Sequence, residues 1–105
     1  PGDLDLGSGK GLADSADLAH AEGLLRVRQQ QRDAALAALR RAAQLAPDNA
    51  RYAYVYAVAR HDYGDATGAI STLKALVAQH PHHAEARSAL TTYTGRQVGA
   101  GKTAP

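Results

Sequence analysis

A repeat of 34 residues is the feature that most constrains the fold. Pro47 and Pro81 are separated by that distance, and the residues before them match at the same offset. A fixed period of this length is typical of proteins built from stacked copies of one small unit, which cannot bury its apolar face alone. The matching pairs are Ala35 and Ala69, Leu36 and Ile70, Leu39 and Leu73, Ala42 and Leu76, and Ala43 and Val77.

Each half of the repeated unit has helical spacing. Between residues 66 and 77 the apolar residues recur at i, i+3, i+4 and i+7, which places them on one helix face. The same stripe occurs one unit earlier. We expect about five helices, near residues 15–29, 32–46, 49–62, 66–79 and 83–94. The predicted fold is all-α, a right-handed superhelix of antiparallel helix pairs.

Residues 52–59, YAYVYAVA, allow a second interpretation. Alternating aromatic and β-branched residues also occur in strands. A run that is apolar on every side also fits a helix that neighbouring helices cover on both sides. The 34-residue period favours the helix.

Helix ends are marked by residues with special backbone properties. Pro47 and Pro81 lack an N–H and disfavour helix at the residue before them. We expect Asp48 to cap the third helix, Gly64 to end it in the left-handed conformation, and Asp65 to cap the fourth.

The two ends of the chain differ from the repeat. Residues 1–12 and 95–105 are rich in glycine and show no periodicity. Segments of this kind bury too little apolar surface to offset the entropy of ordering them. We therefore predict flexible segments at 1–12 and 95–105 around a helical domain at 13–94.

The charge is unevenly distributed. The net charge is +2, but residues 1–22 sum to −4, residues 23–60 to +5 and residues 61–105 to +1. The basic middle segment has no nucleic-acid recognition motif and its arginines are spread over several helices, so nucleic acid is not an expected partner. No apolar run reaches the roughly 18–20 residues that a membrane-spanning helix needs, so a membrane is not an expected partner either.

Nothing in the sequence assembles a catalytic set. There is no cysteine, no serine in a nucleophile-elbow context and no Gly-rich loop after a strand. His80, His82 and His83 cluster around Pro81 and are of a type that binds metals. Neighbouring histidines rarely converge on one ion, however, so we expect a solvated turn in which a histidine caps a helix. The sequence predicts no enzyme activity, cofactor or metal.

The repeat resembles the tetratricopeptide repeat, a helix–turn–helix unit of the same length. The resemblance covers residues 16–49, 50–83 and a trailing capping helix to about 94, and it is closest in Tyr63–Pro81. The first unit departs from the family pattern at Glu22, Arg26 and the turn residue Gln30. Residues 51–93 also look like repeat modules of some bacterial electron-transfer and regulatory proteins.

This resemblance implies a non-catalytic module that binds a peptide or partner helix of another protein in a concave groove. Tyr54 either lines that groove or only supports the apolar run. A structural or self-association role within a larger protein is the alternative, and the sequence leaves the oligomeric state open. The groove positions implied are His20, Leu24, Val27, Arg28, Arg51, Tyr54, Val58, His61 and Asp62, with Glu85, Ser88 and Thr92 in the trailing helix.

Overall fold

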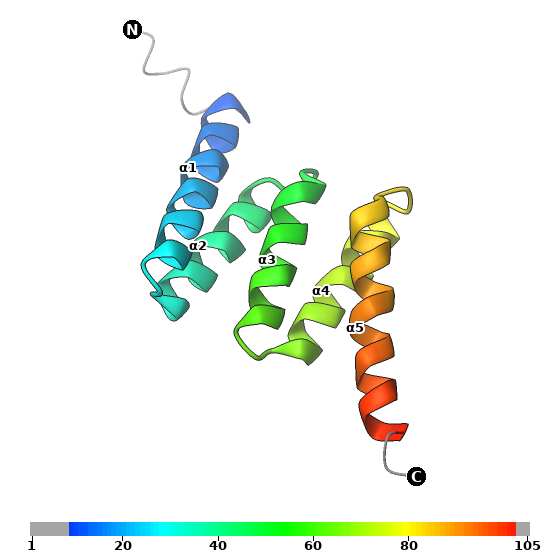
Figure 1. Cartoon of the computed structure of the whole chain (residues 1–105). Coiled ribbons are helices and arrows are strands. Elements are labelled where there is room, and N and C mark those ends of the chain that lie inside the picture. The colour runs from blue at the N-terminus through cyan, green and yellow to red at the C-terminus, as the bar shows by residue number, and fades with distance from the viewer. Residues whose placement is uncertain (1–8, 103–105) are drawn as a thin grey trace, which may run out of the picture.

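Residues 9–102 form five helices, each antiparallel to the next, with the first, third and fifth in one layer and the second and fourth in another (Figure 1). The fold is that of a computed structural model, which describes the backbone of residues 9–102 and the side chains of residues 15–95. This arrangement confirms the predicted all-α repeat fold of helix pairs. The helices are α1 (Gly9–Arg28), α2 (Arg32–Leu45), α3 (Ala50–Asp62), α4 (Ala66–Gln79) and α5 (Ala84–Lys102).

The helix α3 contains residues 52–59, the segment whose sequence also fitted a strand. The described residues 9–102 include no strand, so the helical interpretation of 52–59 is confirmed. Tyr52 and Ala59, seven residues apart, are buried on one side of α3, and Ala57 is buried on another. A helix in the middle of a stack is covered by neighbours on both sides, which explains why its apolar residues show no single stripe.

The core is a seam of small residues into which one leucine of each unit inserts. Leu39 of α2 and Leu73 of α4 are the largest fully buried side chains among the described residues. Leu39 packs against the backbone of α1 at Gly23, while Leu73 shares a buried cluster with Ala57 of α3. Because Ala57 follows Gly23 by one period of 34 residues, both units use the same contact.

The two outer helices are longer than the sequence predicted. α1 begins at Gly9 rather than near residue 15, and α5 runs to Lys102 rather than ending near 94. Helix therefore extends into both segments predicted to be flexible, at residues 9–12 and 95–102. The rest of that prediction falls on residues 1–8 and 103–105, which lie outside the described residues.

The caps of the inner helices agree with the sequence in part. Asp65 accepts a hydrogen bond from the Gly68 N–H at 2.9 Å, and Gly64 has a φ of +96°, as expected. The cap of α3 is Asn49, not Asp48; its Oδ1 accepts from the Tyr52 N–H at 3.3 Å. The prediction of Asp48 was wrong because α3 begins at Ala50, which makes residue 49 its capping position.

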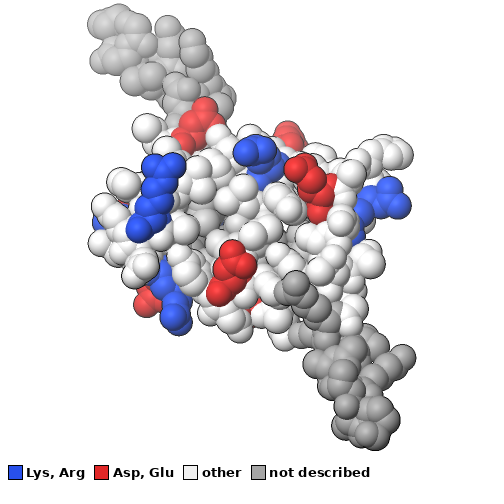
Figure 2. Space-filling view, in the orientation of Figure 1, with Lys and Arg blue, Asp and Glu red and all other residues white. Residues whose placement is uncertain are grey.

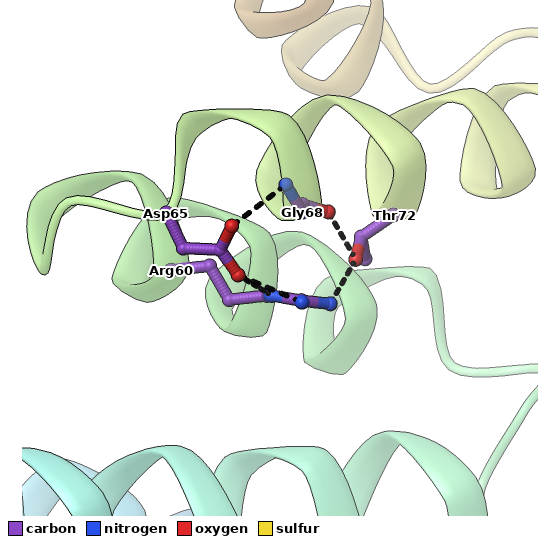
Figure 3. A network of polar contacts seen from close by, with 4 residues as sticks. All are labelled: Arg60, Asp65, Gly68 and Thr72. Carbon is purple, nitrogen blue, oxygen red and sulfur yellow. Dashed lines mark hydrogen bonds and ion pairs between the residues drawn. The ribbon is translucent and has the colours of Figure 1, made fainter.

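Asp65 also ties the α3–α4 turn to the body of α3 (Figure 3). The Arg60 guanidinium lies 2.7 Å from the Asp65 carboxylate and donates to Thr72 Oγ1 at 3.2 Å. Thr72 in turn donates to the Gly68 carbonyl at 2.9 Å. The Gly68 N–H and the Arg60 guanidinium both stabilise the charged form, so they lower the pKa of Asp65.

The first unit builds the equivalent turn from different residues. Gln30 and Gln31 stand where the second unit has Gly64 and Asp65. Arg26, the counterpart of Arg60, donates to Gln31 Oε1 at 2.6 Å. Gln31 makes no side-chain capping bond, and Gln30 is forced to a φ of +60°. The fold therefore imposes a left-handed turn residue even where the sequence supplies no glycine.

We expect Gln30→Gly to stabilise the protein by about 0.5–1 kcal/mol, because glycine adopts positive φ without the steric cost of a Cβ. The free energy of unfolding, from urea titrations followed by circular dichroism, measures it. Gly64→Gln is the matched reverse change and should destabilise. A Cβ at Gly64 meets nothing within 4 Å, so any loss there is conformational rather than steric. If Gln30→Gly left the free energy of unfolding unchanged or lowered it, this account of the turn would be wrong.

Gly23→Ala should destabilise the protein by about 1–2 kcal/mol, although alanine is the better helix former. A Cβ at residue 23 would lie 2.5 Å from side-chain atoms of Leu39. Gly95→Ala in α5 is the control, since nothing lies within 4 Å of its Cβ position. That variant should gain stability from helix propensity. Equal effects of the two substitutions in urea titrations would show that the α1–α2 seam is not tightly packed.

Candidate functional site

A pocket of about 290 Å³ opens between α1 and α3. We call it the α1–α3 pocket. Its walls are almost entirely apolar, with Leu39 of α2 at the base and Asp62 and Tyr63 at the end of α3. The remaining lining residues are Leu24 and Val27 of α1 and Tyr54, Val55, Val58 and Ala59 of α3.

A second pocket, of about 410 Å³, lies between α3 and α5 and is called the α3–α5 pocket. Tyr54 lines both pockets, so the two are neighbours separated by one aromatic ring. The ring of Tyr54 is half-buried and lies 5.7 Å from that of His83. The other residues of the α3–α5 pocket are Ala84, Glu85, Ser88, Ala89, Thr92 and Tyr93.

The two pockets lie on the face formed by α1, α3 and α5, which we call the groove face. It is turned toward the viewer in Figure 1, with α2 and α4 behind. In the same orientation, residues other than Lys, Arg, Asp and Glu dominate the middle of the molecule, and charged side chains are scattered between and around them (Figure 2). The apolar lining of the α1–α3 pocket is of the kind found at the centre of many protein-binding sites.

The structure brings together five of the nine predicted groove residues. They are Leu24, Val27, Tyr54, Val58 and Asp62, all of which line the α1–α3 pocket. Glu85, Ser88 and Thr92, the positions implied in the trailing helix, line the α3–α5 pocket. That these residues bind a partner stays a prediction.

Four predicted residues line neither pocket. Arg28 and Arg51 are exposed. His20 stacks on Tyr52 with ring centroids 4.3 Å apart, and His61 stacks on Tyr93 at 3.8 Å. Each histidine therefore joins one first helix of a unit to the next, His20 from α1 to α3 and His61 from α3 to α5.

The contact between α1 and α3 also contains a polar pair. The Tyr52 hydroxyl donates to Asp17 Oδ1. This bond, together with burial and the negative charge of Asp17, raises the pKa of Tyr52. The Nδ1 of His20 is buried without a hydrogen-bond partner. Burial, followed by the positive charge of Arg51, lowers the pKa of His20.

The histidines around Pro81 form a turn. His83 Nδ1 accepts from the Ala86 N–H at 3.1 Å, so it caps α5 as predicted. His80 is half-buried and His82 is exposed. Within the part of the chain whose side chains are described, no three His, Cys, Asp or Glu residues are placed to hold a metal ion.

Sequence reasoning missed the floor of the α1–α3 pocket. Leu39, Val55 and Ala59 are in the repeat pattern, which assigned them to packing between helices. Leu39, Val55 and Ala59 do pack between helices, but α1 and α3 also leave the α1–α3 pocket open over these residues. The depth of that pocket depends on how far apart α1 and α3 stand, which no sequence pattern reports.

Residues 26–92 match a model of the family described as Tetratricopeptide repeat. The chain belongs to the tetratricopeptide repeat family. The match begins near the end of α1, covers α2, α3 and α4 and reaches into α5, and it confirms the family predicted from the 34-residue period. A search of curated proteins found no match.

Tetratricopeptide repeats are in general modules for protein–protein interaction, and membership of the family gives the present chain this coarse function. The repeat core of this tetratricopeptide protein, Leu39 and Leu73 with their small partners, lies between the helix layers. Across the described residues, none of the helices combines the length and the hydropathy needed to span a bilayer.

The lowered pKa of His20 predicts that stability falls on acidification. The unfolded chain, with a histidine pKa near 6.5, binds a proton more readily than the folded chain. The free energy of unfolding should therefore decrease as pH falls through 6.5 toward the folded pKa, and level off below it. His20→Gln should reduce that slope in urea titrations between neutral and mildly acidic pH.

Arg51→Gln serves as the matched variant for this effect. It removes the smaller of the two causes, so it should retain most of the pH slope. A His20→Gln protein whose stability depends on pH as steeply as that of the parent would contradict the assignment to His20.

Proposed function

We propose that the groove face binds a short segment of another protein by accepting one large apolar side chain in the α1–α3 pocket. The observation that supports this most directly is the exposure of Leu24 and Val27. Their exposed fractions are 40% and 38%, and both residues line the pocket. Apolar side chains that remain accessible in a concave site gain free energy when a partner covers them.

The second support is the position of Tyr54 between the two pockets. Its ring packs against the cluster of Ala57, Leu73 and Leu76, so its orientation is held by the core. A tyrosine fixed in this way offers a large contact area at little cost in conformational entropy, which is why tyrosine is common at binding hot spots. The two sequence interpretations of Tyr54, support and groove, are therefore compatible.

The charge at the groove suggests which segments fit. Asp62 lines the α1–α3 pocket and Glu85 lines the α3–α5 pocket. Arg28 and Arg51 are exposed outside both. We infer a segment with an aliphatic or aromatic anchor and a basic residue beside it, since a cation near Asp62 or Glu85 would find a complementary charge.

A displayed library of short peptides, selected against the chain, tests this proposal. Selected peptides should carry an apolar anchor next to Lys or Arg. Their titration should shift the amide resonances of Leu24, Val27, Tyr54 and Val58. Val58→Glu should weaken binding by at least about tenfold, because a charge in the pocket excludes the apolar anchor.

Ala78→Glu on α4 is the control, because Ala78 is exposed and lines neither pocket. It adds the same charge and should leave the affinity unchanged. Circular dichroism of both variants checks that they fold. Peptides that bind equally well to Val58→Glu, or that shift only the resonances of α2 and α4, would overturn the groove proposal.

A further inference from the structure

The outer face of α1 carries an apolar stripe that no described residue covers. Leu18 is 72% exposed and Leu25 is 48% exposed, with the exposed Ala21 between them. Spacings of three, four and seven residues place them on one helix face. This outer stripe is separate from the groove face, because none of the three residues lines either groove pocket.

The repeat shows that this stripe is built for packing against a helix. One period later, the positions of Leu18 and Leu25 are occupied by Tyr52 and Ala59, which are 9% and 8% exposed. Tyr52 shares a buried cluster with Ala42 of α2. Another period later, Ala86 is fully buried with Leu73 and Leu76 of α4. In α3 and α5 these positions are covered by the preceding helix pair, whereas in α1 they are open.

We propose that a second copy of this chain covers the outer stripe, with the two α1 helices packed antiparallel about a two-fold axis near Ala21. Leu18 of one copy then lies opposite Leu25 of the other, and the same contact occurs twice. Such a self-complementary interface closes after two copies. The result is a dimer joined at the α1 ends of the two stacks, with both groove faces left open.

The charges on α1 favour this antiparallel orientation. Asp17 and Arg28 are exposed and lie on the same flank of the stripe, because eleven residues make just over three helical turns. Antiparallel pairing sets this flank against the same flank of the partner and so brings Asp17 of each copy, whose carboxylate also accepts from the Tyr52 hydroxyl, toward Arg28 of the other. On the other flank, Glu22 and Arg26 already lie 3.7 Å apart within α1.

Among the residues whose side chains are described, the opposite end of the stack offers no matching surface. On α5, the exposed residues among those described are polar or small: Ala84, Glu85, Arg87, Ser88, Thr91, Thr92 and Gly95. Head-to-tail stacking of copies would place this polar face on the apolar stripe and leave polar groups without partners. Pairing of one α1 with another is therefore the favoured arrangement.

The length of α1 argues against a preceding repeat joined as α2 is joined to α3. The start of α3, Ala50, corresponds to Ala16, but α1 is already helical from Gly9. The four-residue turn that leads from α2 into α3 has no counterpart there, because its place is occupied by helix. A second copy covers the stripe without such a connection.

Sedimentation equilibrium of the whole chain, from micromolar to millimolar concentration, tests the proposal. A single helix pair buries less than the roughly 1,200 Å² of a standard interface, so we expect a weak, reversible dimer. The double variant Leu18→Asp/Leu25→Asp should lower the association constant by at least about tenfold. Leu24→Asp is the control: it changes the groove, so it should reduce peptide binding and leave the dimer intact.

Cysteine cross-linking tests the geometry, because the chain has no cysteine of its own. Ala21→Cys lies near the proposed axis and should form a disulfide dimer on mild oxidation, while Ser88→Cys on α5 should not. A chain that stays monomeric at every concentration would overturn the proposal and leave a helix of a longer protein as the occupant. Association that survives Leu18→Asp/Leu25→Asp, or rapid cross-linking of Ser88→Cys, would overturn it as well.

Discussion

The whole stack depends on one steric contact, repeated twice: a leucine of the second helix inserted against a small residue of the first. Leu39 reaches Gly23 in the first unit, and Leu73 reaches Ala57 in the second. Both leucines are fully buried, so each loses its contact with water completely. The close approach is possible only because the facing residue has at most one side-chain carbon. This seam holds α1 to α2 and α3 to α4.

The same seam determines where the functional surfaces lie. With the largest apolar side chains used between the two helix layers, the first helices of the units meet mainly through Tyr52, His20, His61 and Tyr93. These ring contacts hold α1, α3 and α5 side by side without filling the space above them. The α1–α3 pocket is the part of that space where the walls remain apolar.

The two units share the backbone geometry of the turn between their helices, although the residues at that turn differ. In the second unit Gly64, Asp65 and Arg60 each suit their place, and the chain there has a left-handed glycine, a cap and an ion pair. In the first unit Gln30 adopts positive φ although nothing in its side chain favours it. The packing of α1 on α2 therefore overrides the local preference of the turn residue.

The sequence by itself determined the period, the family, the helix type and the four inner turns, because these depend on local spacing and on residues with special backbone properties. It also located five of the pocket residues through the family's groove positions, among them Leu24 and Val58. It placed Asp48 instead of Asn49 as a cap, and it ended α1 and α5 too early, because helix ends depend on the balance of propensity and packing.

Only the tertiary structure decided which apolar residues are covered. Leu18, Tyr52 and Ala86 occupy the same repeat position, yet Leu18 is 72% exposed while Ala86 is fully buried. Periodicity cannot distinguish them, since it describes a residue's place on its own helix and not whether another helix lies beside it. Exposure depends on which helices lie nearby, and α1 differs from α3 and α5 in having no described helix pair before it.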